Sequence, residues 1–169
     1  MGLIFYIILF MEKIFKKILF FYLPLMAWIG GIFYLSSIPG LRSGVESFPL
    51  EVFFRKSAHI FEYMILAFLF FRFFYFAKHF SLEKSKKWSM VFVAICAFLD
   101  ETIQFFVENR AGRLIDVGID VLAGLFMLFL LSSFYSKNKK ARKKNLFGAF
   151  LTFFILALII SIMMYLVSL

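Results

Sequence analysis

Four side chains that can transfer protons lie within otherwise apolar stretches of the chain. His59 and Glu62 are three residues apart, and Asp100 and Glu101 are neighbours. An imidazole titrates near neutral pH, so a histidine beside a carboxylate is suited to general acid–base chemistry. A charged group at the middle of a membrane helix costs roughly 2.5–3.5 kcal/mol, and such groups are usually retained for a function. These four residues are therefore our catalytic candidates.

Further polar residues accompany these four at helical spacing. Pairs three or four residues apart share one face of a helix, so each helix can turn a polar stripe toward its neighbours. The basic members are suited to charge-assisted hydrogen bonds with phosphate or carboxylate groups. The binding candidates are Lys56, Tyr63, Gln104, Arg110, Arg113, Asp116 and Asp120.

The same residues are open to other interpretations. Charged groups in membranes usually pair, so they could form a salt-bridged clamp between helices. Asp116 stands at the start of a predicted helix, which is typical of an N-cap. Carboxylates with one imidazole can also bind a divalent ion. Because the segment lacks the spacing of a zinc site, we predict no metal and no cofactor.

The elements that position these residues are membrane helices. The chain is 63% hydrophobic, contains 28 phenylalanines and has a mean hydropathy of +0.93, whereas soluble domains are about half apolar. A spanning helix needs about 20 mostly apolar residues. The pattern predicts an all-α bundle of about five transmembrane helices in the lipid bilayer, at residues 18–35, 56–77, 88–107, 115–135 and 146–167.

The apolar pattern also divides the chain into four parts. Residues 1–17 are too short to span a membrane and end in lysines, which predicts an amphipathic N-terminal segment at the interface. Residues 18–135 form the four-helix core. A basic cytoplasmic loop follows at 136–145, and a C-terminal transmembrane helix occupies 146–169.

Lysine and arginine are distributed unevenly among the predicted loops. They gather at 13–17, 78–87 and 137–144, on one side of the bundle. Basic loops face the cytoplasm, so we predict an N-terminus inside and a C-terminus outside, with the polar candidates near the outer face. These loops account for the net charge of +9. Without a basic, aromatic-interleaved soluble module, we predict no binding of nucleic acid.

In order along the chain, the polar motifs resemble the VanZ-like family of small multi-pass bacterial membrane proteins. The matching segments are Ser36-Ser37, KSAHIFEY at 56–63, DETIQFF at 100–106, Arg110, and DVGIDVLAG at 116–124. The resemblance covers about residues 18–135. One position departs from the pattern: Asp120 stands where the family has asparagine, which adds a potential charge.

The resemblance implies a protein of the bacterial cell envelope, in the cytoplasmic membrane. The founding member of that family is associated with resistance to the antibiotic teicoplanin. From the residues, we weigh an enzyme acting on a lipid or cell-wall precursor headgroup, a non-enzymatic binder or transporter, and a structural clamp. The inner halves of the helices are almost purely apolar apart from Arg72, which argues against a transport path. Gly30-Gly31 permits close packing within or between chains.

Overall fold

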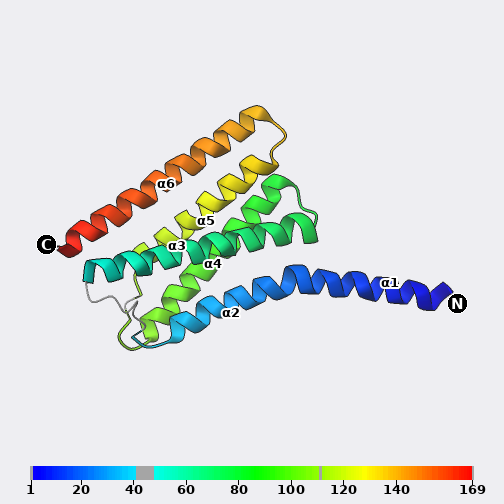
Figure 1. Ribbon diagram of the computed structural model, residues 1–169, viewed down its shortest axis with the longest axis horizontal. Coiled ribbons are helices and arrows are strands. Elements are labelled where there is room, and N and C mark those ends of the chain that lie inside the picture. The colour runs from blue at the N-terminus through cyan, green and yellow to red at the C-terminus, as the bar shows by residue number, and fades with distance from the viewer. Residues whose placement is uncertain (1, 41–47, 111, 169) are drawn as a thin grey trace.

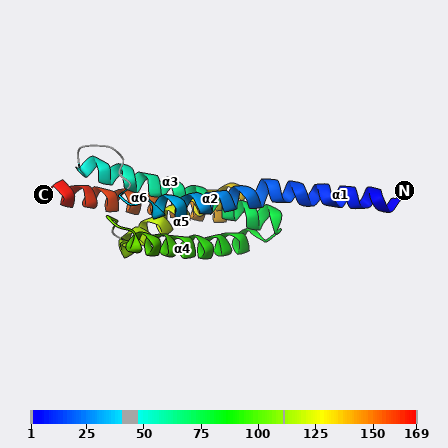
Figure 2. The same cartoon turned by 90° about the horizontal axis from the view of Figure 1, so that it is seen from below.

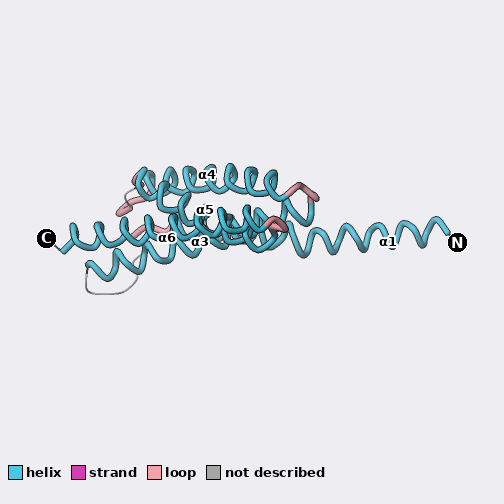
Figure 3. The backbone as a smooth tube through the Cα atoms, turned by 90° about the horizontal axis from the view of Figure 1, so that it is seen from above, coloured by secondary structure: helices cyan, strands magenta, loops and turns pink. Residues whose placement is uncertain are grey.

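The computed structural model describes residues 2–40, 48–110 and 112–168. Within these ranges every regular element is helical, which confirms the predicted all-α class (Figure 3). Figure 1 shows the elements in order. They are α1 (Gly2–Lys17), a π-helical turn η1 (Ile18–Tyr22), α2 (Leu23–Ser37), α3 (Phe48–Arg72), a second π-helical turn η2 (Phe73–Ala77), α4 (Leu82–Phe106), α5 (Leu114–Tyr135) and α6 (Lys139–Ser168).

Five helical segments in the described ranges are long and apolar enough to cross a membrane, as predicted. They are Leu9–Ser37, Leu50–Ala77, Leu82–Phe106, Leu114–Tyr135 and Lys139–Leu166. Many large apolar side chains on their outer faces are exposed, including Phe106, Phe134 and Phe147. A surface of this kind is stable against lipid and unfavourable in water. Five crossings place the two ends of the chain at opposite ends of the bundle (Figure 1).

The first helix is longer than the sequence pattern suggests. We predicted a separate segment at residues 1–17, but α1 continues through the π-helical turn Ile18–Tyr22 into α2 without a break. At about 1.5 Å per residue, the continuous helix is about 55 Å long, whereas the hydrocarbon layer is about 30 Å thick. Its N-terminal part therefore projects beyond the other helices, as Figures 1 and 2 show.

Three other helices also begin earlier than predicted. α3 starts at Phe48 instead of Lys56, α4 at Leu82 instead of Trp88, and α6 at Lys139 instead of residue 146. The predicted basic loop at 136–145 is therefore wrong, since most of it is helix. The cause is Asn138, whose side-chain oxygen accepts hydrogen bonds from the backbone N–H groups of Lys140 and Ala141 at 2.8 and 3.4 Å. Asparagine is a favourable N-cap, and lysines are good helix formers.

Helix α5 is the centre of the bundle. It packs against α3, α4 and α6, and Figure 1 shows it between α6 and the α3–α4 pair. Small residues let the helices approach closely, as is common in membrane bundles. Gly124 of α5 faces Ala67 of α3 and Val93 of α4, and a Cβ added there would lie 2.7 Å from Val93 Cγ1. This close contact brings the polar stripes of α3, α4 and α5 within reach of one another.

We expect Gly124→Ala to lower the free energy of unfolding by about 1–3 kcal/mol, because the added methyl group overpacks the contact with Val93. Gly118→Ala is the matched control on the same helix, since nothing lies within 4 Å of its added Cβ. We expect the control to be neutral or slightly stabilising. Unfolding in detergent measures both variants. Equal effects would show that α5 does not pack closely at Gly124.

The predicted orientation can be tested by labelling single cysteines. The chain has one native cysteine, Cys96, so the background is Cys96→Ala. In intact cells, a membrane-impermeant maleimide is expected to label Glu108→Cys, between α4 and α5. It should label Lys84→Cys and Lys137→Cys only after the membrane is opened. All three positions are exposed. The reverse pattern would overturn the N-in orientation.

Candidate functional site

The polar candidates come from helix ends that meet at one end of the bundle. α2 and α4 end there, and α3 and α5 begin there, on the side where α6 carries the C-terminus (Figure 1). Asp100, Glu101, Gln104, Asp116 and Asp120 are all buried. The cluster therefore lies inside the bundle, although it is built near one end of it.

Three side chains from three different helices face one another in this cluster. Nδ1 of His59 on α3 lies 3.9 Å from an Oδ2 of Asp100 on α4 and 3.6 Å from Oδ1 of Asp120 on α5. The side chains of Asp100 and Asp120 are 0% and 1% exposed, and that of His59 is 14% exposed. We call His59, Asp100 and Asp120 the triad. The sequence predicted each of them and predicted that the polar stripes of their helices converge, but not that these three side chains in particular face one another.

Asp100 is held by a small hydrogen-bond network that reaches α2. Its Oδ1 accepts from the hydroxyl of Ser36, and its Oδ2 accepts from Nε2 of Gln104 at 3.2 Å. The same amide donates to the Ser36 hydroxyl at 3.4 Å. Gln104, a binding candidate from the sequence, thus orients Asp100. Buried carboxylates need such partners, because an unsatisfied one is costly.

Lys56 and Asp116 form a separate ion pair between α3 and α5. Their side-chain atoms are 2.5 Å apart, and both side chains are about nine-tenths buried. We predicted Asp116 as the N-cap of its helix, and this is wrong: Arg113 occupies the N-cap position of α5, and Asp116 lies in the first turn. There its negative charge is still favoured by the positive end of the helix dipole. Lys56 is therefore already neutralised.

Arg110 and Glu101 fasten the ends of the helices together. Arg110 donates to the backbone carbonyls of Leu35 and Ile38, at 2.7 and 3.2 Å, and so caps the C-terminal end of α2. Burial, and next the charge of Arg55, lower the pKa of Arg110 from its usual value, yet a guanidinium stays charged at neutral pH. Glu101 accepts from the backbone N–H of Arg113 at 2.8 Å.

The remaining predicted residues lie around the triad or at its rim. Glu62 is half-buried one turn after His59, and Tyr63 beside it is fully buried. The side chain of Arg113 is exposed at the start of α5. One contact has no motif in the sequence that would predict it: the indole N–H of Trp28 donates to the Glu62 carbonyl at 3.0 Å, which ties α2 to α3. The indole N–H of a buried tryptophan usually has a hydrogen-bond acceptor, so Trp28 by itself does indicate that one lies nearby.

Several buried polar atoms of this cluster lack a hydrogen-bond partner among the described residues. Buried groups in native proteins are nearly always paired, and each exception calls for an explanation. The unpartnered atoms at this end of the bundle are Nδ1 of His59, the hydroxyl of Tyr63, Oε1 of Glu101, Oδ1 of Asp116 and both carboxylate oxygens of Asp120.

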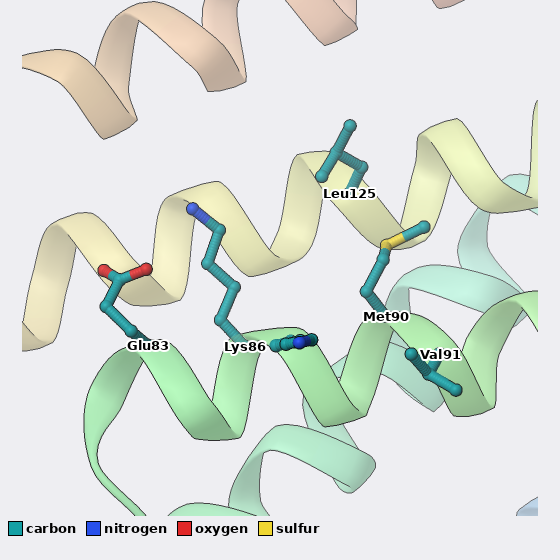
Figure 4. Close-up of a pocket in the computed structure, with 6 residues that line it drawn as sticks. Glu83, Lys86, Met90, Val91 and Leu125 are labelled. Atoms are coloured by element: carbon teal, nitrogen blue, oxygen red, sulfur yellow. The ribbon is translucent and has the colours of Figure 1, made fainter.

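A groove between α4 and α5 lies away from this cluster. It has a volume of about 340 Å³ and is lined by Glu83, Lys86, Lys87, Met90, Val91 and Leu125 (Figure 4). Its lining residues on α4 lie roughly 14–25 Å along the helix from Asp100. Lys86 lies over the ring of Phe129 at 4.4 Å. The groove is open and mostly apolar, and it does not connect to the triad.

Comparison of the chain with known protein families, with curated proteins and with solved structures finds no match. The function proposed for this chain therefore rests on the geometry of the cluster.

We expect Arg110→Gln to lower the free energy of unfolding by about 1–2 kcal/mol, because the C-terminal carbonyls of α2 lose a charged donor. Arg113→Gln removes the same charge from an exposed side chain nearby and should have little effect. Thermal unfolding in detergent compares the two. Similar stabilities would argue against a capping role for Arg110.

Proposed function

We propose that this chain is a VanZ-like protein of the bacterial cytoplasmic membrane, which binds and acts on the polar headgroup of a lipid or lipid-linked cell-wall precursor. The observation that carries the proposal is the set of buried polar atoms without partners around His59, Tyr63 and Asp120. A cluster that served only to hold helices together would gain stability by satisfying these atoms. A cluster that binds a polar ligand keeps them free for it.

The buried and half-buried polar residues at this end of the bundle, which we call the polar layer, form two groups with different roles. Lys56 with Asp116, Arg110 with the end of α2, and Glu101 with the start of α5 form a clamp. These contacts support the clamp interpretation for the layer's outer ring. The triad is different, since its histidine touches two carboxylates and makes no hydrogen bond at Nδ1. The clamp thus positions the triad.

The triad is suited to proton transfer at a headgroup. A histidine near two carboxylates can take a proton from a hydroxyl group and return it to a leaving group. Arg113, exposed at the same end of the bundle, offers a charge for a phosphate group. The basic loops support an N-in orientation, which would place the triad toward the outer leaflet, where a lipid can enter sideways between helices.

The two histidines of the chain provide a matched test. His59 belongs to the triad, whereas His79 is exposed between η2 and α4 with a φ of 56°. Asparagine replaces either one with a similar shape and tolerates a positive φ. Wild-type protein and each variant would be expressed in a Gram-positive host. Mass spectrometry of lipids and lipid-linked precursors, teicoplanin susceptibility and the amount of folded protein are then compared.

We expect the wild-type chain and His79→Asn to change the lipid or precursor pool in the same way. His59→Asn should abolish that change at an equal amount of folded protein. Loss of folded protein for His59→Asn, with no effect of the wild-type chain on any pool, would instead favour a purely structural role for the polar layer.

A further inference from the structure

We infer that the triad is a binding site for one divalent transition-metal ion, of the type of Zn²⁺ or Mn²⁺. Nδ1 of His59 and one carboxylate oxygen each from Asp100 and Asp120 lie within 4.8 Å of one another. The sequence pattern, with no zinc spacing, predicts no metal here. Ligands that come from three separate helices leave no spacing signature in the chain. This inference goes beyond the headgroup function and does not depend on it.

The distances suit a single ion after a small adjustment. Ligand atoms about 2.0–2.2 Å from a common ion lie roughly 3–3.5 Å from one another in a tetrahedral arrangement. The imidazole nitrogen lies 3.6 Å from the Asp120 oxygen and 3.9 Å from the Asp100 oxygen. The carboxylate oxygens of Asp100 and Asp120 lie within 4.8 Å of each other. Rotation of these two side chains by up to about 1–2 Å would bring all three atoms to the separations of a coordination shell.

The burial of Asp120 is a second observation that points to a ligand. Its side chain is 1% exposed, and neither of its carboxylate oxygens has a hydrogen-bond partner among the described residues. The nearby Lys56 is already paired with Asp116, and the single imidazole of His59 is shared between Asp120 and Asp100. An uncompensated buried carboxylate is very costly. A divalent ion would neutralise Asp100 and Asp120 together and leave the triad with no net charge inside the bundle.

The surroundings of Asp100 resemble the support that metal ligands usually have. Ligating side chains are commonly oriented by hydrogen bonds from a second layer of residues, whose loss weakens metal binding about 10–100-fold. Ser36 and Gln104 bond to the two oxygens of Asp100 in this way. An oxygen that accepts from Gln104 still has a lone pair for an ion.

The donor set selects the class of ion. One imidazole with two carboxylates favours Zn²⁺ or Mn²⁺, whereas Mg²⁺ and Ca²⁺ prefer oxygen ligands alone. Three protein ligands also leave at least one coordination position for water or substrate, as in catalytic zinc sites. The side chain of His59 is 14% exposed, so the triad is not completely closed off.

Metal content of the purified chain tests this inference directly. The full-length protein, carrying an affinity tag without histidine, is purified in mild detergent, stripped with a chelator and equilibrated with Zn²⁺ or with Mn²⁺. Elemental mass spectrometry then counts ions per chain, and a melting curve is recorded with and without each ion. We expect one ion per chain and a higher melting temperature, because an ion bound only by the folded state stabilises it.

Acid-to-amide substitutions distinguish the loss of a metal ligand from the loss of a negative charge. Asp120→Asn removes a ligand and should lose the bound ion, whereas Glu108→Gln removes one negative charge from an exposed site at the same end and should keep it. Ser36→Ala should weaken binding by roughly 10–100-fold, since it removes a bond that orients Asp100. Wild-type affinity for either ion in Asp120→Asn would overturn the inference.

Metal uptake by the wild-type protein tests the inference without relying on the folding of any variant. If a shared proton, not an ion, neutralises the triad, the stripped wild-type protein will take up neither ion and will melt at the same temperature with and without them. That result overturns the metal site and leaves the headgroup proposal standing. Should Asp120→Asn fail to fold, His59→Asn takes its place as the ligand-loss variant.

Discussion

The burial of Asp100 and Asp120 in an apolar bundle is the constraint around which this protein is arranged. An ionised carboxylate taken out of water loses solvation worth many kcal/mol, so it must find charges or hydrogen bonds inside the protein. Asp100 finds Ser36 and Gln104, and both carboxylates face His59. Because these partners come from α2, α3, α4 and α5, the need to compensate two acids draws four helices to one point.

The polar layer does two jobs with different residues. Each side chain of its outer ring has a partner: Lys56 pairs with Asp116, Arg110 caps α2, and Glu101 bonds to the start of α5, although one carboxylate oxygen each of Asp116 and Glu101 has none among the described residues. Its centre is not satisfied, since atoms of His59 and Asp120 lack partners. A frame of paired side chains around a centre with more unpartnered atoms is the kind of arrangement that pre-organised sites require. The contacts of the outer ring stabilise the fold and so offset the free-energy cost of burying the unpartnered atoms of His59 and Asp120.

Close helix packing at Gly124, away from the triad, allows the side chains of the triad to reach one another. Gly124 lets α5 approach Ala67 of α3 and Val93 of α4, so short aspartate side chains can reach across the gap at the polar end. The apolar exterior, with exposed phenylalanines along the spans, keeps this end of the bundle in a low-dielectric surrounding. In such a surrounding, electrostatic interactions within the triad are stronger than they would be in water.

The sequence by itself determined the all-α membrane class, five spans and the residues of the polar layer, because hydropathy and helical spacing are local properties. It misplaced the starts of α3, α4 and α6; at α4 and α6 the caps Ser81 and Asn138 begin the helix before the apolar stretch does. Only the tertiary structure decided which polar residues meet. It paired Lys56 with Asp116, turned Arg110 onto the end of α2, and brought His59 to Asp100 and Asp120. Such contacts depend on how each helix is rotated about its axis and how deep it sits in the bundle. Packing between distant segments sets both, so the spacing of residues along one helix cannot predict the contacts.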